Sequence, residues 1–378
     1  MSPRLLNHPW RVKAAIVVAL LLLVFAATGV AVALTGGGQD RSERAQATTS
    51  SPTNVLTPSP PTPEPTIAYW TYNTAIEGGS SSHQAKARTL PTPNRPPSNH
   101  PVLVGAGDIS SCAQDNDAAT AKLVNGVITS ATGQVGVFTV GDNAYESGTD
   151  EEFEHCYGPT WGQFKDRTRP APGNHEYKSG NAGGYFNYFG AAAGDPAQGY
   201  YSYDLGTWHI VVLNTNDHCR QVACDVRSPQ EQWLRADLAA HPANCTLAIW
   251  HDPLFTSGTT HGNAPWAKPF WDDLYAQGAD VVMSAHEHNY ERFAPQTPAG
   301  QPDPQFGIRE FVVGTGGESH YADYNSIRPN SEVRDNKTYG VIRLILHPNG
   351  YDWDFLPAHR GDTFQDSGSG VCHGAPKS

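Results

Sequence analysis

Short apolar runs that end in a chemically reactive polar residue recur through this 378-residue chain. VLVGAGD ends at Asp108, VGVFTVGD ends at Asp142, LAIWH ends at His251, and DVVMSAHEH ends in His286 and His288. Such runs, bordered by glycine and rich in branched residues, predict buried strands. On an extended backbone His286 and His288 would project to the same side. The chain is thereby restricted to folds in which several strands end in polar side chains.

Helical segments alternate with these strands. SPQEQWLRADLAA predicts a helix with Ser228 at the N-cap, Pro229 in the first turn and Glu231 closing a capping box. Further helices are predicted at 116–130 and 266–277, with a loop-rich region from 141 to 199. Strands are predicted at 102–107, 135–140, 200–205, 208–214, 246–250, 280–284, 308–314, 340–346 and 351–356. Alternating strands and helices followed by hairpins indicate a layered α/β domain.

The N-terminal hundred residues have a different character. Residues 14–34 are uninterruptedly apolar and follow Arg4, Arg11 and Lys13, which predicts a membrane anchor with a cytoplasmic N-terminus. A long signal segment cleaved after Ala33 or Ala47 is the alternative. Residues 35–100 are rich in proline, serine and threonine and predict an extended stalk. The catalytic domain is expected at 101–378, outside the cytoplasm, either anchored or secreted.

Charge and cysteine content agree with export. Residues 101–378 contain 33 acidic and 17 basic residues, so the domain lacks the basic surface of a nucleic-acid reader. All six cysteines lie beyond residue 111, without a CxxC pair, which favours disulfides over a structural zinc site. We expect Cys219 to pair with Cys224 and Cys112 with Cys156, which leaves Cys245 with Cys372. Sequence alone does not prove this connectivity.

Five short segments carry the candidate chemistry, and all except the third follow a strand-like run. The third is RPAPGNHEY, with Asn174 and His175, and the second also contains Asn143 and Tyr145. Each segment alone is an ordinary turn or a polar strand end. Together they supply aspartates, asparagine, tyrosine and histidines, a mixed oxygen–nitrogen donor set that suits Fe, Zn or Mn. A carboxylate between two such ions would allow the two-metal chemistry of phosphoryl displacement.

The order GD, GDxxY, GNHE, H and HxHxYER resembles the calcineurin-like metallophosphoesterase superfamily, and most closely its purple acid phosphatase branch. The resemblance covers about residues 101–360. It implies a four-layer α/β/β/α sandwich of two mixed β-sheets flanked by helices, with the metal site on loops at strand ends. It also implies that Asp108, Tyr145 and His288 bind the first metal, an Fe(III). Asn174, His251 and His286 would bind a divalent Fe, Zn or Mn, with Asp142 bridging and His175 assisting the leaving group.

Three departures from the wider superfamily pattern bear on this resemblance. Ser110 replaces a histidine ligand, whereas Tyr145 occupies the position at which the purple branch supplies a tyrosine. Ala285 replaces the usual glycine before the histidine pair. His218, His261 and His320 are candidates for the extra pocket histidines of plant and animal relatives, although a surface position is the plainer interpretation of each.

Two further features receive structural interpretations. GTGGES, residues 314–319, is interpreted as a turn near the site, because no Lys-Ser/Thr follows and no helical pattern begins. Trp250, Trp266 and Trp271 are expected to pack the core around the fourth segment.

The expected function is an exported dinuclear phosphomonoesterase that hydrolyses a small phosphorylated substrate. The metals would lower the pKa of a shared water and supply a bridging hydroxide. We expect direct hydrolysis with inversion at phosphorus. A phosphodiesterase or nucleotide pyrophosphatase is the alternative within the same class. A catalytically weak metal- or phosphate-binding protein of the cell surface is the alternative outside it. No protein partner is indicated by the sequence.

Overall fold

The computed structural model describes residues 99–321, 324 and 326–374. The predicted anchor at 1–34 and nearly all of the predicted stalk lie outside these residues. Among the helices that the structure does describe, none is both long and apolar enough to cross a membrane.

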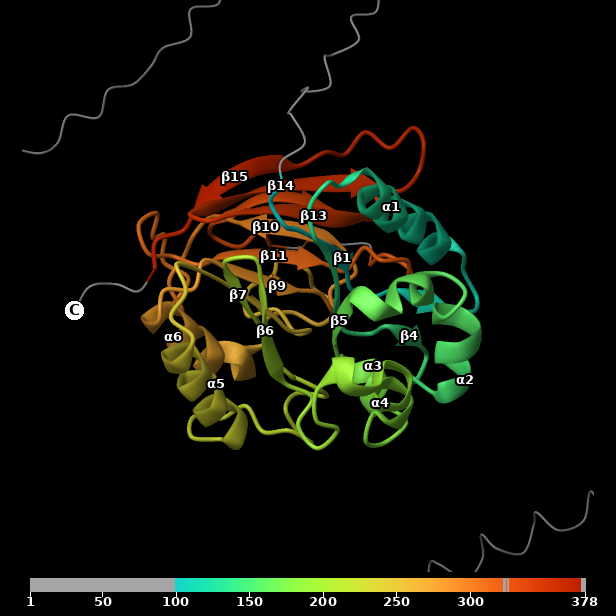
Figure 1. The fold of residues 1–378 in the computed structure, drawn as a ribbon, viewed down its shortest axis with the longest axis horizontal. Coiled ribbons are helices and arrows are strands. Elements are labelled where there is room, and N and C mark those ends of the chain that lie inside the picture. Colours follow the sequence, from blue (N-terminus) through green and yellow to red (C-terminus); the bar gives the residue numbers. More distant parts are fainter. Residues whose placement is uncertain (1–98, 322–323, 325, 375–378) are drawn as a thin grey trace, which may run out of the picture. The chain divides into compact units, whose positions relative to one another are not determined.

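Two mixed β-sheets form the centre of the domain (Figure 1). The first has the order β15 (Ser367–Val371), β14 (Gly350–Pro357), β13 (Gly340–His347), β1 (Val102–Ala106), β3 (Val135–Val140) and β5 (Thr168–Ala171). The second has the order β12 (Ser331–Asp335), β10 (Tyr290–Phe293), β11 (Arg309–Val313), β9 (Val281–Ser284), β8 (Cys245–Ile249), β7 (Trp208–Val212) and β6 (Tyr201–Leu205). A short ladder joins β2 (Ser110–Ser111) to β4 (Ala144–Tyr145). The predicted mixed α/β class is confirmed.

Parallel pairing places the candidate segments on neighbouring strand ends. β1, β3 and β5 are mutually parallel neighbours in the first sheet, and β8 and β9 are parallel neighbours in the second. β1, β8 and β9 are buried along their whole length, which explains why they appear in the sequence as continuous apolar runs.

The core is divided by the sheets. One apolar cluster fills the space between them, with Leu103 and Phe138 from the first sheet and Leu247 and Phe311 from the second. A second cluster packs the outer face of the first sheet against α1 (Asn116–Ser130), and a third packs the other sheet against α5 (Pro229–Ala240) and α6 (Lys268–Ala276). Figure 1 shows α1 on one side of the molecule and α5 with α6 on the other. Trp250 and Trp271 are fully buried in the third cluster, with Trp266 half-buried against it.

Local signals decide where α5 begins. The Ser228 hydroxyl accepts a hydrogen bond from the Glu231 N–H at 3.2 Å, and Pro229 opens the first turn, as predicted. The predicted capping box is incomplete, because the Glu231 carboxylate accepts the N–H of Arg227 at 2.8 Å rather than that of Ser228. The N-cap prediction is therefore confirmed. The predicted donor to the Glu231 carboxylate, the N–H of Ser228, is wrong, because the N–H of the preceding residue, Arg227, takes its place.

Residues 141–199 are more ordered than the sequence predicts. They contain α2 (Asp150–Glu152), a π-helical turn (Phe153–Tyr157), a 3₁₀ segment (Trp161–Arg167), β5, α3 (Asn174–Tyr177), α4 (Gly183–Phe189) and a 3₁₀ turn (Gly190–Ala193). Most of these pieces are too short to show a hydrophobic period. The third candidate segment also follows a strand, β5, contrary to expectation. Pro170 is tolerated there because β5 is an edge strand.

Three disulfides use all six cysteines of the chain. Cys112 pairs with Cys156, Cys219 with Cys224, and Cys245 with Cys372, as predicted. The first joins β2 to the π-helical turn, and the third joins the start of β8 to the C-terminal segment. No free cysteine remains.

Candidate metal centre

All five predicted segments converge at one place. Asp108 and Asp142 follow β1 and β3, Asn174 follows β5, and His251 and His286 follow β8 and β9. Asp108, Asp142 and His286 have positive φ angles of 56°, 49° and 67°. Left-handed backbone at non-glycine residues is uncommon and is held in place by the surrounding structure. The strand ends therefore turn sharply and direct these side chains toward one another.

The first donor group consists of Asp108, Tyr145 and His288. The Tyr145 hydroxyl lies 2.8 Å from Oδ1 of Asp108 and 3.2 Å from Nε2 of His288. Nε2 of His288 lies 3.5 Å from the same carboxylate oxygen. All three side chains are buried.

The second donor group consists of Asn174, His251 and His286. Nε2 of His251 lies 3.1 Å from Oδ1 of Asn174 and 3.0 Å from Nδ1 of His286. The two histidines are buried, and Asn174 is half-buried at the start of α3.

Asp142 lies between the two groups. Its Oδ2 is 3.2 Å from the Tyr145 hydroxyl and 3.2 Å from Nε2 of His251. Its other oxygen accepts the backbone N–H of His175 at 2.8 Å. One carboxylate oxygen thus touches a member of each donor group.

The donor set fits a cation. Nδ1 of His251 lies 2.7 Å from the carbonyl oxygen of Val140 and therefore carries the proton, which leaves a lone pair on Nε2. That lone pair meets the acceptor oxygens of Asn174 and Asp142. Nδ1 of His288 likewise faces the carbonyl oxygen of Ser319 at 2.6 Å, so that its Nε2 lone pair faces Asp108. Converging lone pairs repel one another unless a positive charge lies between them.

The titration behaviour agrees with this geometry. Burial opposes the charged form of His251, but the carboxylates of Asp142 and Asp108 outweigh it and raise the His251 pKa to about 10. Burial is likewise outweighed at Asp142, where His251 and His175 hold the pKa below its usual range. Burial and nearby histidines lower the pKa of His286, and burial next to Asp108 raises that of Tyr145. The site therefore favours positive charge at its donor atoms.

Glu176 supports the site from behind, a role that the sequence did not indicate. Its fully buried carboxylate accepts the N–H groups of Asp142 at 3.0 Å, Asn143 at 2.7 Å and Gly173 at 2.7 Å. Burial and the charge of Asp142 raise its pKa to about 8. Gly173 is required because a Cβ there would lie 2.2 Å from Oδ1 of Asp142. Glu176 and Gly173 together fix the turn that carries Asp142.

His175 lies at the open side of the site. Its ring is half-buried, lies 4.3 Å from the Tyr145 ring between centroids, and places Nε2 3.8 Å from Oδ2 of Asp142. Nδ1 lies 2.8 Å from the carbonyl oxygen of Glu146. The exposed ammonium of Lys178 lies 2.8 Å from Nε2. An imidazole and a cation thus border the mouth of the site.

The further histidines differ in their distance from the centre. His261 stacks on His286 with ring centroids 3.8 Å apart, and its Nε2 lies 3.1 Å from the hydroxyl of Tyr321. The Tyr321 ring in turn stacks on His288 at 4.1 Å. His320 is turned away, with Nδ1 2.8 Å from the carbonyl oxygen of His288. His261 is exposed, as the plainer interpretation predicts, and its ring also lies over the site.

The YER segment after the histidine pair is strand β10, and its side chains anchor distant parts of the chain. The Tyr290 hydroxyl and Nε of Arg292 each donate to Oδ2 of Asp366 at 2.7 Å. Glu291 accepts the N–H of Ser257 at 2.7 Å. These contacts tie the end of the histidine segment to two loops.

The remaining departures have local explanations. The Ser110 hydroxyl donates to Asp117 at 2.7 Å, so it is occupied away from the donor groups. The methyl group of Ala285 lies where a Cβ at Gly107 would meet it at 2.5 Å, so the alanine fits only because residue 107 lacks a side chain. The stretch 314–319 is a turn beside the site, as predicted, with the Glu318 N–H donating to the Asp108 carbonyl at 3.0 Å.

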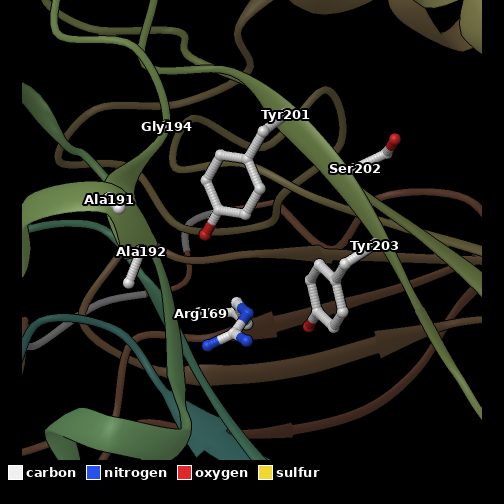
Figure 2. Close-up of a pocket in the computed structure, with 7 residues that line it drawn as sticks. All are labelled: Arg169, Ala191, Ala192, Gly194, Tyr201, Ser202 and Tyr203. Carbon is white, nitrogen blue, oxygen red and sulfur yellow. The ribbon is translucent and has the colours of Figure 1, made fainter.

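A separate pocket of about 410 Å³ lies between β5 and β6 (Figure 2). Its lining includes Arg169, Tyr201 and Tyr203 together with Ala191, Ala192, Gly194 and Ser202. It contains none of the predicted site residues and no set of metal-binding side chains. This pocket therefore adds nothing to the candidate chemistry at the strand ends.

A layered α/β fold with a buried carboxylate–imidazole–phenol donor set at strand ends defines the class of metal-dependent hydrolases. A family model for the calcineurin-like phosphoesterases matches residues 101–290. The chain belongs to this family.

Within the family the chain is most similar to purple acid phosphatases. Purple acid phosphatase 15 of Arabidopsis thaliana is 31% identical over 150 residues, which cover 35% of this chain and 27% of that protein. A nucleotide pyrophosphatase/phosphodiesterase of Hordeum vulgare is 25% identical over 254 residues, covering 55% and 64%. The structure of the yellow lupin (Lupinus luteus) purple acid phosphatase PPD1 shares the fold, with a TM-score of 0.54, 19% identity, and coverage of 71% and 53%. The chain thus spans less than two thirds of the length of these relatives.

Proposed function

We propose that this chain is a dinuclear metal-dependent phosphoesterase that hydrolyses phosphomonoesters. Asp108, Tyr145 and His288 would hold the first cation, an Fe(III). Asn174, His251 and His286 would hold a divalent Fe, Zn or Mn. The family and its purple acid phosphatase relatives support this assignment.

One observation carries the proposal. A single oxygen of Asp142 lies 3.2 Å from a member of each donor group. A carboxylate in this position would be able to serve both cations, which supports the proposal. The carboxylate and imidazole donors on both sides of it are buried and would be stabilised by positive charge there.

The residues of the chain would divide the reaction between them. When bound, the two cations supply a water of lowered pKa and neutralise charge on the phosphoryl oxygens. Glu176 holds the backbone of Asp142 in place, so that the geometry of the site is set before substrate arrives. His175, at the open side, would have to be protonated on both ring nitrogens, and would then deliver its Nε2 proton to the departing alkoxide. Lys178 beside it would attract the anionic substrate.

A covalent enzyme intermediate is not required. All six cysteines are in disulfides, and the hydroxyl of Ser110 is bonded to Asp117. Water would therefore attack phosphorus directly, and the configuration there would invert.

The test is metal analysis combined with substrate comparison on natively produced full-length protein. We expect two metals per chain, iron among them, and hydrolysis of 4-nitrophenyl phosphate. Protein that holds two metals yet hydrolyses no phosphoester would instead be a metal- or phosphate-binding protein. Trapping of a phosphorylated side chain would contradict direct attack by water.

A phosphodiesterase or nucleotide pyrophosphatase is the second candidate, supported by the similarity to the barley protein of that name. The ratio of kcat/KM for 4-nitrophenyl phosphate, bis(4-nitrophenyl) phosphate and ATP separates the candidates. We expect the monoester to be preferred at least about tenfold, since a diester must fit a second substituent beneath the His261–Tyr321 pair.

We also propose that the domain acts outside the cytoplasm, held by or cleaved from the segment 14–34. The three disulfides support an oxidising compartment. Fractionation of cells that make the full chain, followed by mass spectrometry of its N-terminus, distinguishes anchored from secreted protein. Recovery of reduced protein in the cytoplasm would contradict export.

A further inference from the structure

Asp252 has a buried carboxyl group that the proposed donor groups do not use. The residue follows His251 directly and is fully buried. Within the described residues, neither carboxylate oxygen accepts a hydrogen bond of normal geometry. Its backbone is nevertheless fixed, because its N–H donates to the Thr215 hydroxyl at 3.2 Å and its carbonyl accepts Nε1–H of Trp250 at 2.8 Å. An unpaired buried carboxylate is strongly unfavourable.

The nearest basic group is the ring of His286. Oδ1 of Asp252 lies 3.6 Å from Nε2 of His286. The other ring nitrogen, Nδ1, faces the donor group and lies 3.0 Å from Nε2 of His251. The imidazole therefore lies between the metal site on one side and the carboxylate on the other.

We propose that Asp252 is a positioning residue for metal binding. After a small approach from the present separation of 3.6 Å, its carboxylate would accept the Nε2 proton of His286, so that the lone pair of His286 is held on Nδ1 and directed at the second cation. A carboxylate behind a metal-binding histidine fixes the tautomer and increases the basicity of the ring. This inference rests on the proposed metal function.

A competing arrangement uses the same carboxylate as a ligand. His218, Asp252 and His286 offer atoms that lie within 4.8 Å of one another, which could hold an additional cation. His218 is exposed, however, and its ring packs at a tilt against Trp266 with centroids 4.4 Å apart. Asp252 and His286 are both buried, so their proximity does not depend on His218. The two arrangements predict different effects of removing His218.

The experiment is a titration of the metal-free full-length protein with Zn²⁺ against a competing chelator, together with thermal unfolding of the same metal-free samples. For Asp252→Asn we expect the affinity for the more weakly bound of the two zinc ions to fall about 10- to 100-fold, with two zinc ions still bound at saturation. The metal-free melting temperature should stay close to that of the wild type, because the Asp252 carboxylate accepts no hydrogen bond of normal geometry that the substitution could remove. His218→Ala should bind zinc as the wild type does.

Asp280→Asn is the matched control. Asp280 is also buried, but its carboxylate accepts the N–H groups of Thr246 at 2.9 Å and His373 at 3.0 Å, far along β8 and β9 from the donor groups. Its variant should unfold at a lower temperature and bind zinc normally. Zinc affinity of Asp252→Asn within twofold of wild type would overturn the inference. So would the loss of one zinc ion in both the Asp252 and His218 variants. If the wild type bound no zinc, the proposed metal function itself would fail.

Discussion

Asp142 and His251 meet through their side chains, with Oδ2 of Asp142 3.2 Å from Nε2 of His251. Both groups are buried, and each shifts the pKa of the other toward the charged form. The negative charge of the carboxylate and the positive charge of the imidazole thus stabilise each other. A cation that replaces the proton would inherit the same interactions.

Asp142→Asn should therefore remove most activity. The variant keeps the shape of the side chain but loses the negative charge shared by the two donor groups. We expect kcat to fall by more than about 100-fold, since even residues behind metal ligands give effects of 10- to 100-fold. Steady-state kinetics and metal content are the measurements. Asp195→Asn, an exposed loop residue, is the matched control, and near-normal turnover in Asp142→Asn would contradict the bridging role.

Tyr145→Phe should change the visible spectrum. If the first cation is Fe(III), a bound tyrosinate gives an absorption band that the phenylalanine variant lacks. Tyr157→Phe serves as the control, because Tyr157 is equally buried and its hydroxyl has no hydrogen-bond partner among the described residues. A band that persists in Tyr145→Phe and disappears in another tyrosine variant would reassign the ligand.

The stability of the domain should depend on pH through His209. Its buried ring lies 2.8 Å from Asp237 and 3.0 Å from Asp204. Burial lowers its pKa, but the two carboxylates outweigh burial and raise it above the ordinary value. The folded state thus binds the proton more tightly than the unfolded state. The resulting stabilisation is complete below the unfolded pKa of about 6.5 and is lost as pH rises through the folded pKa.

The measurement is the free energy of unfolding between pH 6 and 8.5. We expect the wild type to lose about 1 kcal/mol over this range, a modest value because Asp204 is largely exposed. His209→Gln should have a lower free energy of unfolding than the wild type at pH 6. That free energy should also fall less than the wild-type value as the pH is raised. Equal slopes for the two proteins would rule out His209 as the source.

The three disulfides should contribute unequally. Their sequence separations are 5, 44 and 127 residues. The entropy of loop closure in the unfolded chain predicts losses of about 2, 4 and 5 kcal/mol when each pair is replaced by serine. Chemical denaturation of the three double variants tests this order. A reversed order would show that contacts in the folded state outweigh the entropy of loop closure.

Asp366→Ala should destabilise the fold more than it affects the chemistry. Asp366 accepts hydrogen bonds from Tyr290, Arg292 and Trp353. Removal leaves the largely buried Arg292 without this partner, which should reduce the free energy of unfolding by about 3 kcal/mol. At 15 °C, where the variant is folded, kcat should stay within about threefold of wild type. A large loss of kcat there would place β10 closer to the reaction than its contacts indicate.

Strand ends were the most predictable part of the fold and of the site. Asp108, Asp142 and His251 follow runs whose apolar character is dictated by burial on both faces of a sheet. The sequence therefore indicates both where each strand ends and which polar residue follows it. The short helices between 141 and 199 were not predictable, because three to seven residues cannot show a helical period. Their formation depends on packing against the outer face of the first sheet.

Supporting residues were harder to predict for a different reason. Glu176 matters through the backbone N–H groups of Asp142 and Asn143, and Asp252 through its distance from His286. Neither relationship leaves a pattern in the spacing of side chains. His261 and Tyr321 reach the site only because two loops fold over the same strand ends.

The donor residues come from both sheets, with Asp108, Asp142 and Asn174 on one and His251, His286 and His288 on the other. Bound cations would therefore link the two β-sheets at one edge. A small displacement of one sheet relative to the other would change the separation of the two cations. Substitutions in the core between the sheets, at residues such as Phe138 and Phe311, would then change the distance between the two cation positions, although neither residue belongs to the donor groups.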